Sequence, residues 1–413
     1  MIGKRPGISA YDNKETNMST YLELARKHEP QLVRFMRDII AIKSLSSQEG
    51  QVIKRIQAEM KKLGYDKTWI DPMGNLIGQI GKGKRVIAID GHVDTVDVGD
   101  LKQWKTDPFD PVLKNGILYG RGCSDMKGGV AAAVYAGAML KKSGRMPKNV
   151  TLLVTATVQE EDCDGQCWDF IVKKDKIRPD LVIITEPTSL RVYRGHRGRM
   201  EIEVETTGVS CHGSAPERGV NAVYKMAPII ADIEKLNERL KPRKPLGKGT
   251  VTISHIRSRS PSLCAVADGC TIHLDRRLTV GETETIAVNQ IRNLPSVKKA
   301  KAKVTVLNYD VPSWTGLVFP FKKYFPTWEM PGSRPEVKLA EQAHQEVFGE
   351  KAVVGHWTFS TNGIATAGLH GIPTIGYGPG HEHFAHAPNE CVEIEHLVRA
   401  AAFYAGYVDA FGR

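Results

Sequence analysis

Short, continuous runs of apolar residues constrain the fold of this 413-residue chain more than any other feature. Residues 86–89, 150–158 and 181–185 are rich in Val, Ile and Leu, and segments with helical periodicity separate them. Runs of this kind are typical of parallel strands that are buried on both faces of a sheet. We therefore predict an α/β fold in which a mostly parallel sheet carries helices on both faces.

Acidic and histidine residues stand at or near the ends of these predicted strands. In open α/β sheets, ligands bind beyond the carboxyl ends of the strands. Each residue taken alone has an ordinary explanation, such as a helix cap, a turn or a solvated acidic loop. Five unrelated loops at one sheet edge would all have to carry such residues by chance, so we interpret the set as one two-metal hydrolytic site. Its members are His92, Asp94, Asp125, Glu160, Glu161, Glu186 and His386.

The charges of this set fit a pair of divalent cations. Two such ions bring +4 and three ligating carboxylates bring −3, which leaves +1 at the centre to lower the pKa of water and polarise a carbonyl group. Glu160 and Glu161 are neighbours in the chain, and neighbouring side chains of an extended segment point in opposite directions. One of them can therefore bind metal while the other accepts a proton from water.

The length of the chain indicates two domains. From about Gly198 the apolar residues alternate with polar ones, as expected of a sheet with one exposed face. We predict an α+β unit, called here the inserted unit, at residues 198–308. It interrupts a discontinuous metal-binding domain formed by residues 19–197 and 309–413, and residues 1–18 form a loose tail.

Helical periodicity begins at Leu32, and a second helix follows with Ser46 or Ser47 as its N-cap and Gly64 as its end. Residues 309–332 are predicted to be an irregular loop. The predicted helices span residues 32–42, 51–63, 126–142, 166–174, 220–240 and 282–294, one that starts at Pro335, and 394–411.

Composition excludes several classes of protein. The net charge is +11, but basic residues are interleaved with acidic ones and no nucleic-acid-binding signature is present, so we expect a solvated basic surface rather than a nuclease. The longest apolar stretch has 13 residues, short of the roughly 20 that span a bilayer. Seven scattered cysteines argue against a disulfide framework, and the pair Cys163 and Cys167 lacks the second pair of a zinc site. We expect a soluble, cytoplasmic protein that binds neither nucleic acid nor membrane.

Several stretches of the chain, in a consistent order from about Leu32 to the C-terminus, resemble the motifs of the aminoacylase and carboxypeptidase-G type of dizinc metallopeptidases. That superfamily includes acetylornithine deacetylase and succinyl-diaminopimelate desuccinylase. Residues 158–165, 209–219 and 357–363 most resemble its subgroup of selenium-metabolism-linked hydrolases. The superfamily motifs are residues 91–95, 120–129, 160–161, 185–188, and His386 followed by Asn389 and Glu390.

The resemblance implies two Zn²⁺ per subunit in a zinc-peptidase fold, and Co²⁺ or Mn²⁺ also suit mixed imidazole and carboxylate ligands. Glu160 would be the general base, and Asp94 would accept a hydrogen bond from the His92 ring. The spacing to Asn389 and Glu390 favours His386 as a ligand, with His381 and His383 as alternatives. The implied ligands are His92 and Glu186 for one ion, Glu161 and His386 for the other, and Asp125 as the bridge.

In this family the inserted domain, expected to be ferredoxin-like, is a lid and a dimer interface. The resemblance therefore implies a homodimer in which His212 reaches the partner's active site and steadies the oxyanion. Arg277 would clamp a substrate carboxylate, with Arg276 as the alternative. Gly378, within a glycine-rich stretch, would let the substrate approach closely, and Asn362 stands where many members have Asp in the substrate site.

These features together predict an amidohydrolase. Its substrate would be a small N-acyl or N-carbamoyl amino acid, or a dipeptide-like molecule, cleaved at an amide or ureido C–N bond. A catalytically silent scaffold protein that keeps the metal site is the alternative, although such a protein would need neither Glu160 nor His212.

Overall fold

A nine-stranded mixed sheet forms the centre of the larger half of the protein, as the computed structural model shows for residues 20–413. The tail predicted at residues 1–18 lies outside the described residues. In spatial order the strands are β1 (Lys67–Ile70), β2 (Leu76–Ile80), β6 (Val150–Thr157), β3 (Arg85–His92), β7 (Leu181–Ile184), β20 (Thr374–Gly376), β8 (Val192–His196) and β18 (Trp328–Glu329), and β19 (Val354–Trp357) also pairs with β8.

The middle of this sheet is parallel, as the apolar runs predict. β6, β3, β7 and β20 pair in parallel, and Ile89 of β3 lies opposite Val154 of β6 and Ile183 of β7. Antiparallel strands are added on both sides, at β1–β2, at β2–β6 and around β8. The predicted α/β class is therefore confirmed, and the sheet is mixed, with a parallel central part and one further parallel pair, β19 with β8.

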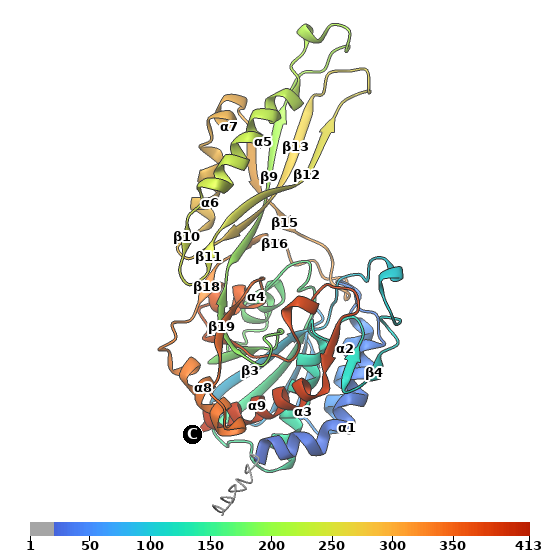
Figure 1. The fold of residues 1–413 in the computed structure, drawn as a ribbon, viewed down its shortest axis with the longest axis vertical. Coiled ribbons are helices and arrows are strands. Elements are labelled where there is room, and N and C mark those ends of the chain that lie inside the picture. Colours follow the sequence, from blue (N-terminus) through green and yellow to red (C-terminus); the bar gives the residue numbers. More distant parts are fainter. Residues whose placement is uncertain (1–19) are drawn as a thin grey trace, which may run out of the picture.

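Helices cover both faces of the sheet. Gly91 of β3 approaches Val130 on one face, whereas the neighbouring Asp90 reaches Asn362 on the other. α3 is rich in Ala and Gly, so it packs closely on the strands, and it also packs against α1 and α9 (Figure 1). The helices of this half are α1 (Thr20–Ile40), α2 (Gly50–Leu63), α3 (Lys127–Lys142), α4 (Gln166–Lys173), α8 (Pro335–Phe348) and α9 (Ile394–Gly412).

α1 starts earlier than predicted, and the cap predicted for α2 is not formed. α1 begins at Thr20 and passes through Pro30, which hides the first turns of the helix from a reading of periodicity. Neither Ser46 nor Ser47 caps α2: Glu49 precedes the helix without a side-chain cap, and the Ser46 hydroxyl donates to Asp94 instead. The predicted end at Gly64 is confirmed, since this residue adopts φ 86° after the last turn.

A second sheet, entirely antiparallel, extends away from the first (Figure 1). Its strands β9 (Gly198–Thr207) and β13 (Gly269–Leu278) alternate between buried and partly exposed residues, as predicted. Three helices pack on it and enclose a separate apolar core: α5 (Ala222–Arg239), α6 (Glu284–Arg292) and α7 (Pro295–Ala300). The strand order is β12 (Thr250–Arg259), β13 (Gly269–Leu278), β9 (Gly198–Thr207) and β14 (Lys303–Val306), with β17 (Tyr324–Phe325) also paired to β9.

Short strands complete the structure, and some lie in the segment predicted to be an irregular loop. Within residues 309–332, β16 (Phe321–Lys322) pairs with β15 (Asn308–Tyr309), β17 pairs with β9 of the second sheet, and β18 pairs with β8 of the first sheet. This segment therefore adds a short strand to each sheet. The pairs were not predictable because each strand has only two residues. The remaining strands are β4 (Val112–Lys114), β5 (Ile117–Tyr119), β10 (Pro242–Arg243), β11 (Gly247–Lys248), β15 (Asn308–Tyr309), β16 (Phe321–Lys322) and β21 (Cys391–Glu393).

The two sheets are joined by two chain segments that lie side by side. β8 runs into β9, and β17 runs into β18, so His196 lies opposite Trp328 and Arg199 lies opposite Phe325.

Among residues 20–413, no helix is long and apolar enough to cross a membrane.

His196 stabilises this junction in its neutral form. Its Nε2 accepts hydrogen bonds from the Trp328 indole at 2.8 Å and from the Thr361 backbone at 3.1 Å, while Nδ1 donates to the Arg197 carbonyl. Burial lowers the pKa of His196 to about 4. Protonation of Nε2 would place a hydrogen atom on the nitrogen to which the N–H groups of Trp328 and Thr361 already donate.

Stability should therefore fall as the pH drops from about 6.5 to about 4, because the unfolded chain takes up a proton that the folded one refuses. We predict that the free energy of unfolding falls by about 2 to 3 kcal/mol less in His196→Gln than in the wild type between pH 7 and pH 4.5, because Gln keeps an acceptor but cannot be protonated. Urea unfolding at the two pH values measures this. The exposed His255→Gln should behave as the wild type, and an equal loss in His196→Gln would contradict the assignment.

Candidate dinuclear metal centre

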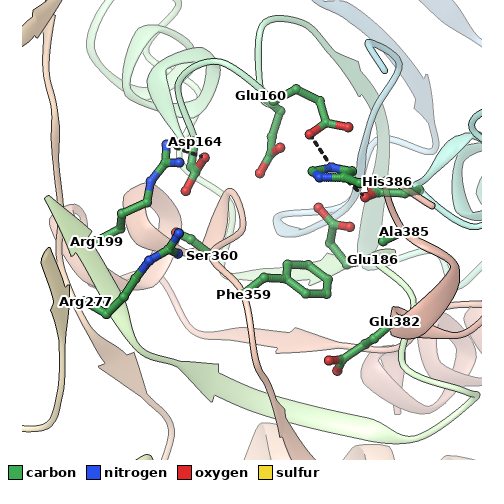
Figure 2. A pocket seen from close by; sticks show the side chains of 12 residues that line it. Glu160, Asp164, Glu186, Arg199, Arg277, Phe359, Ser360, Glu382, Ala385 and His386 are labelled. Carbon is green, nitrogen blue, oxygen red and sulfur yellow. Dashed lines mark hydrogen bonds and ion pairs between the residues drawn. The ribbon is translucent and has the colours of Figure 1, made fainter. Parts of the chain in front are cut away.

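The residues predicted as metal ligands meet at one edge of the large sheet. His92 ends β3, Glu160 and Glu161 follow β6, and Glu186 follows β7, so three neighbouring strands deliver them to the same place. Asp125 precedes α3 and lies against this edge. The loop before β21 brings His386 into the lining of the same cavity (Figure 2).

Asp125 lies between the two histidines. Its Oδ1 is 3.1 Å from Nε2 of His92, and its Oδ2 is 3.4 Å from Nε2 of His386. His92 Nε2 also lies 3.5 Å from Glu186, and His386 Nε2 lies 2.8 Å from Glu161. One carboxylate that uses a different oxygen toward each histidine has the geometry of a bridge between two ligand groups.

Ligand atoms gather closely enough to share ions. One potential ligand atom from each of His92, Asp125 and Glu161 lies within 4.8 Å of the others, and the same holds for His92, Glu160 and Glu186. Imidazole and carboxylate are the donors that zinc and similar divalent ions take. Glu160, expected as the base, also lies near His92, with its Oε2 3.7 Å from Nε2 of the ring.

The electrostatics of the four carboxylates also fit cations. Burial, with repulsion from Asp125, raises the pKa of Glu161 to about 7 and that of Glu186 to about 8, and burial raises the pKa of Glu160 well above its usual value. Burial also opposes ionisation of Asp125, but hydrogen bonds with the two histidines hold its pKa below the usual range.

Unused acceptors point to the same conclusion. Glu160, Glu161 and Glu186 each have one buried oxygen with no hydrogen-bond partner among the described residues. Buried acceptors of this kind are costly unless something compensates them. Divalent cations would supply that compensation, so the residues present fit a metal pair.

Asp94 positions the segment that carries both glutamates. Its carboxylate accepts hydrogen bonds from the backbone N–H groups of Glu160 and Glu161 and from the Ser46 hydroxyl. The His92 ring hydrogen-bonds mainly to the Asp94 backbone carbonyl, at 3.0 Å, and the carboxylate oxygen lies 3.5 Å away. Asp94 therefore orients His92 through its main chain more than through its carboxylate.

Glu390 fixes the loop that carries Asp125. It is fully buried and accepts hydrogen bonds from the backbone N–H groups of Gly122, Ser124 and Asp125 and from the Arg121 side chain. The sequence reading used Glu390 only to mark the spacing from His386. In the sequence, the position of this acid four residues after His386 was the available signal for its second role.

Asn362, predicted to bind substrate, is not among the residues that line the cavity. Its side chain is buried beneath the metal centre, where Nδ2 donates to Asp90 and Thr157 and Oδ1 accepts from the Gly165 backbone. The reason is the buried carboxylate of Asp90, which needs donors. Sequence reading missed Asp90 because it lies inside an apolar run.

Gly378, predicted to let the substrate approach closely, lies against the backbone that follows β7. A Cβ atom there would lie 2.1 Å from the carbonyl oxygen of Glu186 and 2.3 Å from that of Thr185. The glycine is required because two backbones approach each other, and it holds the end of β7 in place. It is buried and is not among the residues that line the cavity.

The alternative placed on Arg276 is excluded, because this side chain is fully buried and bonds to Glu282 and Gln290. Arg277, the prediction, lines the cavity, and Asp275 holds its guanidinium through two hydrogen bonds at 2.8 and 3.0 Å. His381, an alternative to His386 as a ligand, is not among the residues that line the cavity and contacts Ser189.

His212 lies on the inserted unit, exposed, and hydrogen-bonds to Ser214 at 2.7 Å. It is not among the residues that line the cavity of its own chain. Its expected role in catalysis therefore requires a second subunit.

The cavity in front of the carboxylates has a volume of about 310 Å³, enough for a small molecule. In Figure 2, Arg199 and Arg277 lie on one side of the cavity and His386 lies on the other, and Phe359 lies between these two sides. The lining residues are Asp125, Glu160, Glu161, Asp164, Glu186, Arg199, Arg277, Phe359, Ser360, Glu382, Ala385 and His386.

Known proteins match the chain over most of its length. The family described as Peptidase family M20/M25/M40 matches residues 88–410. Uncharacterized protein YgeY of Escherichia coli strain K12 is 53% identical over 384 residues, which are 93% of this chain and 95% of that protein. Acetylornithine deacetylase of Proteus mirabilis strain HI4320 is 27% identical over 391 residues, 88% of this chain and 92% of that protein.

A solved structure shares the fold. The crystal structure of the Bacillus subtilis YXEP protein, a dinuclear metal-binding peptidase from the M20 family, matches with a TM-score of 0.68 at 14% identity. The match covers 93% of this chain and 98% of that chain. Both halves of the present structure are therefore included in the shared fold.

We predict that Gly378→Ala destabilises the protein by about 1 to 3 kcal/mol, because the new methyl group would press on backbone oxygens that cannot rotate away. It should also weaken metal binding about 10-fold or more by displacing Glu186. Urea unfolding and metal titration measure the two effects. Gly332→Ala is the control, since a Cβ atom there meets nothing within 4 Å, and equal behaviour of the two variants would refute the close approach.

Proposed function

Because this chain belongs to peptidase family M20/M25/M40, we propose that it is a dinuclear zinc hydrolase that cleaves an amide or ureido C–N bond in a small N-acyl or N-carbamoyl amino acid or a dipeptide-like molecule. The observation that carries this proposal is the meeting of two histidines and four buried carboxylates around a cavity of small-molecule size. The alternative of a silent scaffold would leave the unused oxygen of Glu160 without a purpose.

In this proposal His92 and Glu186 hold one ion, Glu161 and His386 hold the other, and Asp125 contacts both. The contacts of Asp125 with both histidines support the division. A metal pair supplies an acidified water molecule and polarises the substrate carbonyl. Zinc suits this mixture of imidazole and carboxylate donors.

Glu160 acts as the general base. Its Oε2 lies 3.7 Å from His92 Nε2, its Oε1 is buried without a hydrogen-bond partner among the described residues, and burial raises its pKa well above the usual value. The carboxylate takes a proton from the attacking water and delivers it to the nitrogen of the leaving amine. A raised pKa makes the carboxylate a stronger base toward the attacking water than an ordinary glutamate would be.

Arg277 binds the carboxylate of the amino acid. Its guanidinium lines the cavity about one third exposed, and Asp275 fixes the plane of the fork. A planar, oriented guanidinium is suited to a carboxylate.

We further propose a homodimer formed through the inserted unit, which also acts as a lid over the cavity. β12 lies at the edge of its sheet, and the apolar side chains of Ile256, Val209 and Leu263 on this unit are exposed. A second copy would cover them. In the dimer His212 of the partner subunit reaches the cavity and stabilises the oxyanion.

Replacing Glu160 with Gln should leave two metal equivalents per subunit but reduce kcat about 10²-fold to 10⁴-fold on N-acyl amino acids, because the proton shuttle is lost. Metal analysis and a substrate panel with and without chelator measure this. Glu395→Gln, an exposed control, should keep full activity. Undiminished turnover in Glu160→Gln would remove the base assignment, and a metal-loaded wild type that cleaves nothing would favour the scaffold.

His212→Ala should lower kcat by about 10²-fold to 10³-fold. Mixing it with Glu160→Gln should restore activity to about a quarter of the wild-type sites, since half of the dimers are mixed and each has one complete site. Activity assays after subunit exchange, with sedimentation to establish the dimer, measure this. A purely additive, inactive mixture would contradict a site shared between subunits.

A further inference from the structure

Asp164 and Arg199 lie side by side on the cavity wall next to Glu160 (Figure 2). Asp164 belongs to the loop after β6, and Arg199 belongs to β9 of the inserted unit, so the pair connects the two halves of the protein. Nη2 of Arg199 is 3.3 Å from Oδ1 of Asp164. The side chains are 18% and 7% exposed for Arg199 and Asp164, respectively.

Each member of the pair keeps an unused polar atom. Oδ2 of Asp164 and Nε of Arg199 are buried and have no hydrogen-bond partner among residues 20–413. Arg277 differs, because its Nε and Nη2 both donate to Asp275. A buried acceptor and a buried donor without partners cost stability, unless a ligand satisfies them.

The charges of Asp164 and Arg199 offset each other within the pair. Glu201, at 3.8 Å from Arg199, is already bonded to Lys323 at 3.0 Å and to His273 at 3.2 Å. A neutral subsite with one free donor and one free acceptor favours an uncharged dipolar group over a second carboxylate or an ammonium group.

We propose that Asp164 and Arg199 form a subsite for a terminal carboxamide group, –CO–NH₂. The amide N–H donates to Oδ2 of Asp164, and the amide oxygen accepts from the Arg199 guanidinium. This inference rests on the proposed function and narrows its substrate class to amino-acid derivatives that bear such a group. Two sources share this chemistry: the carbamoyl end of a ureido compound, and the side-chain carboxamide of an N-acylated amino acid.

Two matched substrate pairs distinguish the sources. N-carbamoyl-alanine and N-acetyl-alanine differ only in NH₂ against CH₃, and N-acetyl-asparagine and N-acetyl-leucine differ only in a carboxamide against an isopropyl group of similar shape. The wild type should prefer the carboxamide member of one pair by about 100-fold or more in kcat/KM, because a site built for hydrogen bonds rejects an analogue that lacks them. The pair that shows the preference identifies the source.

Asp164→Asn tests the acceptor. The substitution is isosteric but presents an N–H donor or a rotated amide to the substrate, so the preference should fall at least 10-fold, with the carboxamide substrate losing more than its partner. Arg199→Lys, which loses the planar fork, should also reduce the preference. Asp162→Asn, on the same loop but exposed and bonded to Tyr309, should keep the wild-type ratio.

The outcomes separate the inference from the function beneath it. If both substrates of each pair are cleaved at similar rates by the wild type, or if Asp164→Asn slows both members of the preferred pair equally, the pair is a structural bridge and the inference is overturned while the hydrolase proposal stands. If the metal-loaded protein cleaves none of the four substrates and the Glu160→Gln variant binds none of them in calorimetry, both proposals fall together.

Discussion

Repulsion among carboxylates crowded into one buried space is the constraint on which the rest of this structure depends. Asp125, Glu160, Glu161 and Glu186 face one another with little solvent to screen them. The loops that bear them would spread apart unless they were held. Asp94 and Glu390 hold them by accepting hydrogen bonds from the backbone N–H groups of those same loops. Two further acids thus fix the positions of the loops that carry the four carboxylates.

The part of the fold that the sequence predicts is the part encoded locally. β3, β6 and β7 are continuous apolar runs, and a predicted ligand stands at the end of each or within four residues of it, so strand, edge and ligand could be inferred together. The same holds for Gly64, where a glycine ends a periodic segment. The start of α1 and the cap of α2 were mispredicted, because Pro30 and the serines give stop and cap signals that distant contacts override.

The residues that sequence reading misplaced or missed owe their roles to distant partners. Asn362 serves Asp90, which is 272 residues away, and Gly378 makes room for the backbone of Glu186. Arg276 and Arg277 are neighbours, yet strand alternation buries one and turns the other toward the cavity. Motif spacing cannot distinguish such residues from substrate contacts, since both kinds stand beside catalytic segments. Only the packing of the whole sheet separates them.

The paired strands between the two sheets limit how the inserted unit can travel. A two-stranded ribbon resists shear and stretching in its own plane, because its ladder bonds would break, but it bends and twists readily. The pairs His196–Trp328 and Arg199–Phe325 form such a ribbon with a gap at residues 197–198. The unit should therefore swing about this gap along one arc. A side chain placed just past the pivot, as Arg199 is, moves least, so its half of the cavity keeps its shape while the far rim opens.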